Sequence, residues 1–307
     1  VGFLFIFEHY NTEFNRILIN LKKPITASFA NLIRVSFWIF ILLIYLLIYK
    51  TASLYFLLNL WLMSNIICFV YSYYAISLYL GKNFFLPRFK NLKWVILNFK
   101  KNFLFFTNGF LDKMIEVLDR YFIAYFLTIT VLGIYFYFYS LAMAVFVFLS
   151  AGIGTIFGPM IIESYMKSDF KSYKKIRNNY LIIILVLYFL GLLFAYPALE
   201  VVLYLTKRPI INDYKSIFWI LYIVAFIKVI NTWLFTELYI RLLDKKIIIS
   251  TILSFFLLII LNLILIPKFG IYGCAFSALG SSIIILISRI YYLINYKAEN
   301  PPSTIIS

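Results

Sequence analysis

Five ionisable side chains crowd into one short stretch of an otherwise apolar region, 108-NGFLDKMIEVLDRYF-122. They are Asp112, Lys113, Glu116, Asp119 and Arg120. Phenylalanine-rich sequence precedes the stretch and aromatic sequence follows it. Carboxylates and cations at this density can pair with one another, bind a charged ligand or take up a proton. Which of these they can do depends on the side of the segment that they occupy.

The stretch predicts a helix with one polar face. At 100° per residue, the five charged residues and Asn108 fall within an arc of about 140°, and the remaining positions are apolar apart from Gly109. A charge at the bilayer centre costs about 2.5–3.5 kcal/mol, so five facing lipid would cost about 12–17 kcal/mol. That is as large as the net stability of a typical protein. The face must therefore meet protein or water, either as the wall of a polar cavity or as a structural ion-pair network.

A second apolar segment, 226-FIKVINTWLFTEL-238, carries a matching set of polar residues. Lys228, Asn231 and Thr232 share one helical face there. Lys228 then lines the same cavity, or it only neutralises the acidic residues of the first stretch. The predicted cavity residues are thus Asn108, Asp112, Lys113, Glu116, Asp119, Arg120, Lys228 and Asn231.

The surrounding sequence is that of an all-α integral membrane protein. It is 64% hydrophobic and 13% charged, with a mean hydropathy of +0.96, whereas soluble domains are about 45–50% apolar and about 25% charged. The apolar runs are continuous rather than alternating, which disfavours a transmembrane barrel. Eight spans are predicted, at 35–49, 55–80, 103–127, 129–158, 178–196, 215–239, 247–266 and 270–294. The first is short and is expected to begin earlier, and Pro197 is expected to end the fifth.

The excess of basic residues, 28 against 12 acidic ones, indicates membrane orientation rather than nucleic-acid binding. Twenty of the 28 lie on one side of the predicted spans, five on the other and three inside spans. Arg289 and Lys297 are counted on the first side, as part of the tail region. Positively charged connections stay in the cytoplasm, so both ends of the chain are predicted to be cytoplasmic. The basic connection 81–101 is either an amphipathic segment at the membrane surface or a solvated linker.

Several kinds of chemistry have no sequence support. There is no Walker A motif, no histidine inside a predicted span, and no cysteine pattern typical of a metal site or a disulfide framework. We therefore predict no catalytic residues, no metal and no cofactor.

Three stretches resemble a known family in their order and spacing. A charged span with 119-DRYFIAYFL-127 runs into 131-VLGIYFYFYSLA-142, a proline and a basic connection follow in 159-PMIIESYMKSDFKSYKKIRNN-179, and 266-IPKFGIYGCAFSALGSSI-283 forms a glycine-marked turn. Over roughly residues 10–295, the chain resembles the C-terminal part of lipid-linked oligosaccharide flippases. These are the O-antigen and polysaccharide exporters of the multidrug/oligosaccharidyl-lipid/polysaccharide superfamily.

The resemblance implies a two-lobe transporter of twelve or more helices, of which about four N-terminal helices are missing, so the chain is expected to be a fragment. Residues 1–80 would be the remainder of the N-terminal lobe and 81–101 the cytoplasmic linker. Residues 102–295 would be the C-terminal six-helix lobe and 296–307 a cytoplasmic tail.

The implied function is flipping of a polyprenyl-diphosphate-linked oligosaccharide in the bacterial inner membrane, by alternating access through a polar cavity between the lobes. The lipid-linked oligosaccharide, membrane lipids and polysaccharide assembly proteins are the expected partners, and the chain is expected not to be an enzyme. Lys113, Arg120 and Lys228 would pair with phosphate or acidic sugars, while the acidic residues position these cations or take up a proton. Two alternatives stay open. One is a membrane enzyme acting on polyprenyl-linked sugars, and the other is a drug exporter, which a net acidic cavity would favour.

Overall fold

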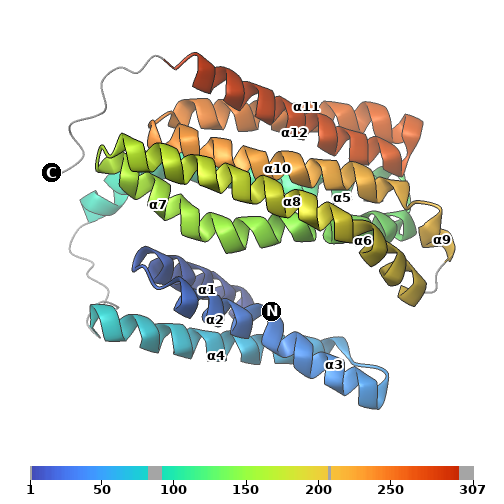
Figure 1. The fold of residues 1–307 in the computed structure, drawn as a ribbon. Coiled ribbons are helices and arrows are strands. Elements are labelled where there is room, and N and C mark those ends of the chain that lie inside the picture. The colour runs from blue at the N-terminus through green and yellow to red at the C-terminus, as the bar shows by residue number, and fades with distance from the viewer. Residues whose placement is uncertain (1, 82–91, 207–208, 297–307) are drawn as a thin grey trace. The chain divides into compact units, whose positions relative to one another are not determined.

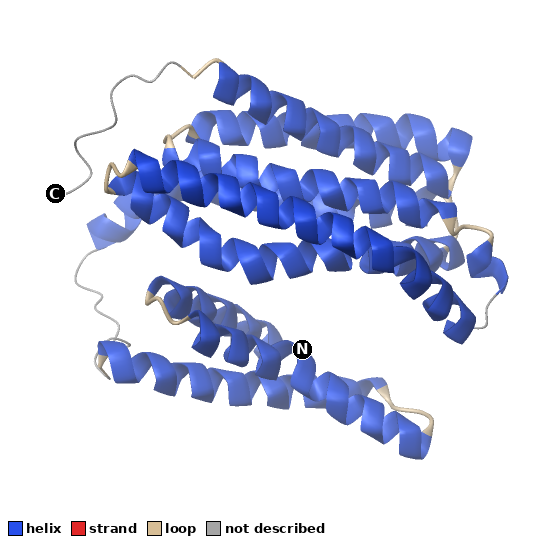
Figure 2. Ribbon diagram, in the orientation of Figure 1, coloured by secondary structure: helices blue, strands red, loops and turns tan. Residues whose placement is uncertain are grey.

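The computed structural model describes residues 2–81, 92–206 and 209–296, and all regular elements in these ranges are helices (Figures 1 and 2). Contacts divide the chain into two compact units, Val1–Leu92 and Lys93–Ser307, and each is described by itself. Seven helices in the described ranges are long and apolar enough to cross a membrane. The charged helix that contains the predicted span 103–127 is not among these seven. The chain is therefore a multi-pass, all-α membrane protein, as predicted.

The first unit contains five helical segments. They are α1 (Gly2–Asn20), α2 (Pro24–Leu32), the π-helical η1 (Ile33–Phe37), α3 (Trp38–Tyr49) and α4 (Leu54–Leu80). Segments α2, η1 and α3 form one continuous span from Pro24 to Tyr49, so the first span begins well before residue 35, as expected. Pro24 suits the first helical position, where its missing N–H is not needed. Ser53 caps α4 by accepting a hydrogen bond from the Phe56 N–H at 3.2 Å.

Polar side chains hold the helices of the first unit together. Asn11 Nδ2 donates to Asn65 Oδ1 at 3.0 Å, which joins α1 to α4. Arg34, at the π-helical turn, lies 3.4 Å from Glu8 and donates to Thr12 at 2.6 Å. Such bonds secure helix packing in lipid, where apolar contacts alone give no hydrophobic driving force.

The second unit is a larger helical bundle (Figure 1). Its segments are α5 (Leu92–Phe126), α6 (Ile129–Phe148), π-helical η3 (Leu149–Gly154), α7 (Thr155–Met166), α8 (Phe170–Thr206), α9 (Pro209–Asn212), α10 (Ser216–Ile240), α11 (Asp244–Phe269) and α12 (Ile271–Ile294). Its core includes the fully buried side chains Tyr135, Phe138, Ile217 and Leu221, which come from α6 and α10. The 35 residues of α5 span about 52 Å, more than the hydrocarbon core requires. Residues 82–91 of the predicted linker 81–101 and residues 297–307 of the predicted tail lie outside the described residues, whereas residues 92–101 begin α5.

Among the described residues, three prolines lie inside helices, Pro159, Pro197 and Pro267, although the sequence suggests that the first two mark helix ends. The segment that contains Pro159 continues to Met166, and α8 continues through Pro197 to Thr206. A proline removes one hydrogen bond and displaces one carbonyl, which kinks a helix. Inside a membrane no water is available to the freed groups, so the remaining helical bonds persist on both sides. The prediction that Pro197 ends its helix is therefore wrong.

The turn between α11 and α12 explains the glycine pattern in 266-IPKFGIYG-273. Gly270 has φ +58° and ψ −135°, a conformation essentially restricted to glycine. A side chain at Gly273 would overlap the backbone oxygen of Leu265. The two glycines therefore allow a reversal so tight that the two helices start in direct contact.

A buried carboxylate joins the beginning of α8 to the end of α10. Glu237 is 2% exposed, and its Oε2 accepts hydrogen bonds from the Tyr173 hydroxyl and from Arg241, each at 2.7 Å. Arg177 approaches the same oxygen at 3.9 Å. Burial lowers the pKa of Arg241, but the neighbouring Glu237 carboxylate raises it, and the net effect is an increase. The guanidinium therefore stays charged. This cluster holds the two helix ends together.

Candidate functional site

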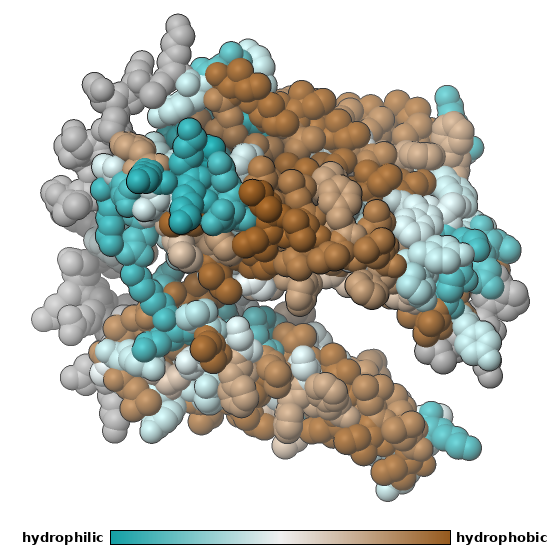
Figure 3. All heavy atoms as spheres, viewed as in Figure 1, coloured by the Kyte–Doolittle hydropathy of each residue, from teal (hydrophilic) through white to brown (hydrophobic). Residues whose placement is uncertain are grey.

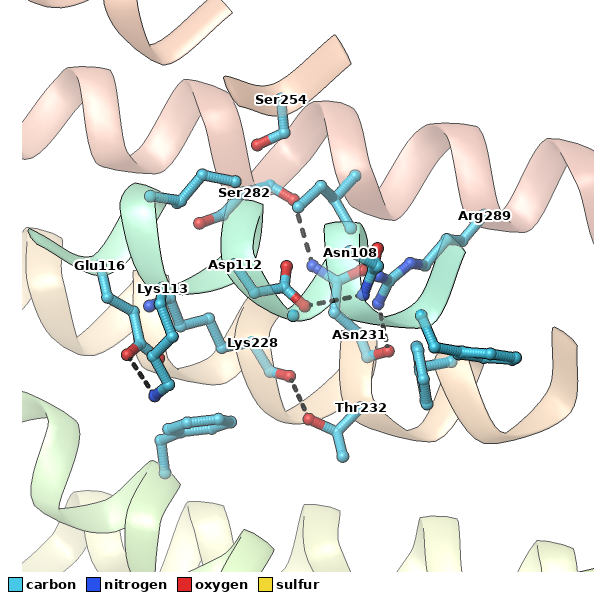
Figure 4. Close-up of a pocket in the computed structure, with 16 residues that line it drawn as sticks. Asn108, Asp112, Lys113, Glu116, Lys228, Asn231, Thr232, Ser254, Ser282 and Arg289 are labelled. Carbon is cyan, nitrogen blue, oxygen red and sulfur yellow. Dashed lines mark hydrogen bonds and ion pairs between the residues drawn. The ribbon is translucent and has the colours of Figure 1, made fainter. Parts of the chain in front are cut away.

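The second unit contains a cleft of about 470 Å³ that is lined by polar side chains from four helices (Figure 4). Its polar lining consists of Asn108, Asp112, Lys113, Glu116, Lys228, Asn231, Thr232, Ser254, Ser282 and Arg289. Aromatic side chains, among them Phe105, Phe146 and Phe235, complete the walls. The cleft thus combines apolar faces with a few convergent polar groups, which is typical of ligand sites.

Helix α5 contributes a hydrogen-bonded wall. Asn108, which is 5% exposed, donates from Nδ2 to Asp112 Oδ2 at 3.0 Å. Its Oδ1 accepts a hydrogen bond from Thr251 of α11 at 2.7 Å. Asn108 therefore orients the Asp112 carboxylate and attaches this part of α5 to α11.

The next turn of α5 carries an ion pair at the side of the cleft. Lys113 Nζ lies 2.8 Å from Glu116 Oε2, and the Lys113 side chain is 77% exposed. An exposed pair of this kind contributes only about 0–1 kcal/mol to stability, but it gives the Glu116 carboxylate a local partner.

Helix α10 supplies the opposite wall, with Lys228 near its middle. No carboxylate among the described residues lies within 4.0 Å of Lys228, and its Nζ is 5.9 Å and 6.0 Å from the ring centroids of Tyr139 and Phe146. Asn231, one turn further on, donates from Nδ2 to the Ser282 carbonyl at 3.2 Å. Its Oδ1 is buried and has no hydrogen-bond partner in the described part of the chain. This wall therefore offers one unpaired cation and one unused acceptor.

Arg289 of α12 is a charged cleft residue that is absent from the predicted set, as are Ser254 and Ser282. It was assigned to the tail region, which is wrong, because it lies inside α12 and is only 5% exposed. Its Nη1 donates to the Asn231 carbonyl at 2.8 Å, and its guanidinium lies 5.6 Å from the Phe235 ring (Figure 4). The spacing of Ser282, Ile285 and Arg289 on one helical face was a signal that could have placed it in the cleft.

Two predicted cavity residues lie elsewhere. Asp119 is 4% exposed and accepts hydrogen bonds from the Tyr135 hydroxyl at 3.0 Å and from Asn262 Nδ2 at 3.1 Å. It therefore ties α5 to α6 and α11 in the interior of the bundle. Arg120 places its guanidinium 4.5 Å from the Phe136 ring centroid and does not line the cleft. The charged stretch thus forms a cleft wall in its first half and a packing contact in its second.

The cleft carries a small positive charge. Its cations are Lys113, Lys228 and Arg289, and its carboxylates are Asp112 and Glu116, which gives a net charge of +1. Each carboxylate already has a local partner, Asn108 for Asp112 and Lys113 for Glu116. The ligand that fits best is therefore an anion with hydroxyl or amide groups beside it.

No protein-family model, no curated protein and no solved structure matches this chain. The function is accordingly inferred from the chemistry of the cleft.

Proposed function

We propose that the chain takes part in moving a polyprenyl-diphosphate-linked oligosaccharide across a bacterial cytoplasmic membrane, for export of a surface polysaccharide. The observation that carries the proposal is the net positive cleft inside a bundle of membrane-spanning helices. A sugar–diphosphate head group cannot enter hydrocarbon unaided, because its charges and hydroxyls would lose their water. The cleft replaces part of that water with fixed polar groups.

Each polar group of the cleft has a counterpart in such a ligand. The Lys228 ammonium and the Arg289 guanidinium, neither of which forms an ion pair in the described part of the chain, suit phosphate oxygens. The unused Oδ1 of Asn231 suits a sugar hydroxyl. The Phe105, Phe146 and Phe235 rings suit the apolar faces of sugars or the first part of the lipid.

The position of the cleft fits loading from the cytoplasm. It is lined by the middle of α5 and by the later halves of α10 and α12. The sequence at that end is basic, in 167–177 and 241–246, so the proposed topology places this end, and both chain ends, in the cytoplasm. Alternating access then requires a second state in which the cleft opens to the other side.

The cleft chemistry favours this function over the two alternatives. A site for cationic drugs is expected to be acidic, whereas this cleft has three cations and two carboxylates. An acid–base enzyme needs carboxylates free to exchange protons with a substrate, whereas Asp112 and Glu116 are held by Asn108 and Lys113.

The test is translocation of a fluorescent polyprenyl-diphosphate oligosaccharide by the full chain in proteoliposomes. Lys228→Gln should lower the rate about tenfold or more, because a charge-assisted contact of about 1.5–3 kcal/mol is lost. Lys167→Gln is the matched control, since its side chain is 70% exposed, pairs with Glu163 at 2.8 Å and does not line the cleft, and it should stay within about twofold. Absence of transport by the wild type, or equal loss in both variants, would refute the proposal.

A further inference from the structure

A second hollow in this unit is almost entirely apolar. It measures about 230 Å³ and lies between α6, α8 and α10. Of its eleven lining residues, ten have no polar side-chain atom. The eleventh, Tyr222, donates its hydroxyl to the Tyr188 carbonyl at 3.3 Å. We call this hollow the apolar groove.

Small residues form one wall of the apolar groove. Gly191, Ala195 and Ala198 follow one another along α8, and Ala144 faces them from α6. A Cβ at Gly191 would lie 3.2 Å from the Tyr222 hydroxyl and 3.3 Å from Val145. The groove exists where these positions lack bulky side chains.

The surroundings of the groove are those of a lipid-facing surface. All three of its helices are membrane-spanning by length and composition. Phe194, which lines the groove, is 70% exposed. The visible face of the second unit is hydrophobic across its middle and hydrophilic towards both ends (Figure 3). The groove therefore opens onto hydrocarbon.

One end of the groove has the features of a membrane interface. The Tyr196 and Trp219 rings stack there at 6.4 Å, and such amphipathic rings concentrate at the level of lipid head groups. Lys215 lies just before Phe218 of the groove wall and makes an exposed contact of 3.5 Å with Glu200. A lipid with its chain in the groove would thus have its phosphate close to the Lys215 ammonium.

The groove is separated from the polar cleft. Val145 faces the groove and the next residue, Phe146, faces the cleft. Between the two lie Met143 of α6 and Val224 and Ala225 of α10, which are buried against each other. One lipid cannot place its head group in the cleft and its chain in the groove without passing through this contact.

We infer that the apolar groove binds one acyl chain of a membrane phospholipid, as a resident lipid distinct from the transported one. Its phosphate lies beside Lys215 and its chain runs along the small residues of α8. Compared with free lipid, the chain gains dispersion contacts with three helices, and it fills a space that side chains leave empty. The inference stands whether or not the chain is a flippase.

The test is photo-crosslinking of the full chain in liposomes with a phospholipid that carries a diazirine on one acyl chain. Peptide mapping should show enriched labelling at 141–145, 191–202 and 218–222, relative to α3, which has no buried residue, in the same sample. The double variant Ala195→Leu/Ala198→Leu fills the groove and should lower this enrichment about threefold or more. Leu193→Phe is the matched control, because it adds bulk to the same helix outside the groove, and it should leave the labelling unchanged.

Two further measurements make the result decisive. If the double variant does not fold, as judged by gel filtration and melting, the single variant Ala195→Leu replaces it. Unlabelled phospholipid is then added as a competitor, and it should reduce the labelling of the groove more steeply than the labelling of α3. Competition with polyprenyl phosphate should have little effect. Uniform labelling of α3 and the groove, or displacement by polyprenyl phosphate in preference to phospholipid, would overturn the inference.

Discussion

Asp119 should contribute to stability rather than to ligand binding. Its carboxylate accepts hydrogen bonds from two fully buried donors, Tyr135 at 3.0 Å and Asn262 at 3.1 Å. Asp119→Ala leaves both donors unpaired, and each buried unpaired group costs about 1–3 kcal/mol. The expected loss is therefore about 2–6 kcal/mol of the free energy of unfolding, a large part of typical protein stability. Asp119→Asn keeps one acceptor oxygen and should lose about half as much.

The assay is equilibrium unfolding in mixed micelles, followed by circular dichroism. Arg120→Gln, at the next position, serves as the matched control. It removes only the contact with the Phe136 ring, centred 4.5 Å away, and should cost about 0.5–1 kcal/mol. The structural role of Asp119 is refuted if Asp119→Ala costs no more than Arg120→Gln. It is equally refuted if Asp119→Ala unfolds like the wild type but loses ligand binding.

Three further predictions follow from the geometry of the second unit. Gly273→Ala should lower the free energy of unfolding by about 1–3 kcal/mol or more in the same assay, because the added Cβ would overlap the backbone of Leu265. Gly280→Ala should be tolerated, because its Cβ would meet only the flexible end of the Leu261 side chain, at 2.7 Å. Glu237→Ala should lower the free energy of unfolding by about 3–5 kcal/mol, because it leaves two arginines without their buried carboxylate. Its control, Glu163→Ala, removes an exposed pair and should lower it by less than about 1 kcal/mol. Hydrogen bonds from Ser172 hold the pKa of Asp169 below its usual range, so its stabilising effect is present above about pH 4 and is lost as pH falls through the lowered pKa. Melting temperatures measured from pH 6 to pH 3 should therefore fall more for the wild type than for Asp169→Asn; equal slopes would contradict this.

The helices and the cleft wall on α5 follow from the sequence because each is a local pattern. Long apolar runs predict the spans, and helical periodicity places Asn108, Asp112, Lys113 and Glu116 on one face. The cost of charges in lipid then turns that face inward. Helical periodicity likewise places Lys228 and Asn231 on one face of a second apolar segment, which forms the opposite wall.

What could not be predicted depends on contacts between distant segments. Periodicity gives Asp119 and Asp112 the same face, but only the positions of Tyr135 and Asn262 decide that Asp119 is enclosed while Asp112 borders the cleft. The sequence pattern uses Arg289 only as a positive charge that indicates membrane orientation. Its burial depends on contacts with α10 and α11, which the sequence does not show. The continuation of α8 through Pro197 likewise depends on the membrane environment rather than on local preference.

Transport by charge variants of Lys228 tests the central claim most directly. Replacing this cation by an acid changes the net charge of the cleft from +1 to −1. In proteoliposomes, Lys228→Glu should abolish translocation of the polyprenyl-diphosphate oligosaccharide, because an acid repels the diphosphate. Lys228→Arg should retain most of the translocation, because it keeps the positive charge. Wild-type transport rates in Lys228→Glu would contradict the proposal that this cleft carries the diphosphate head group.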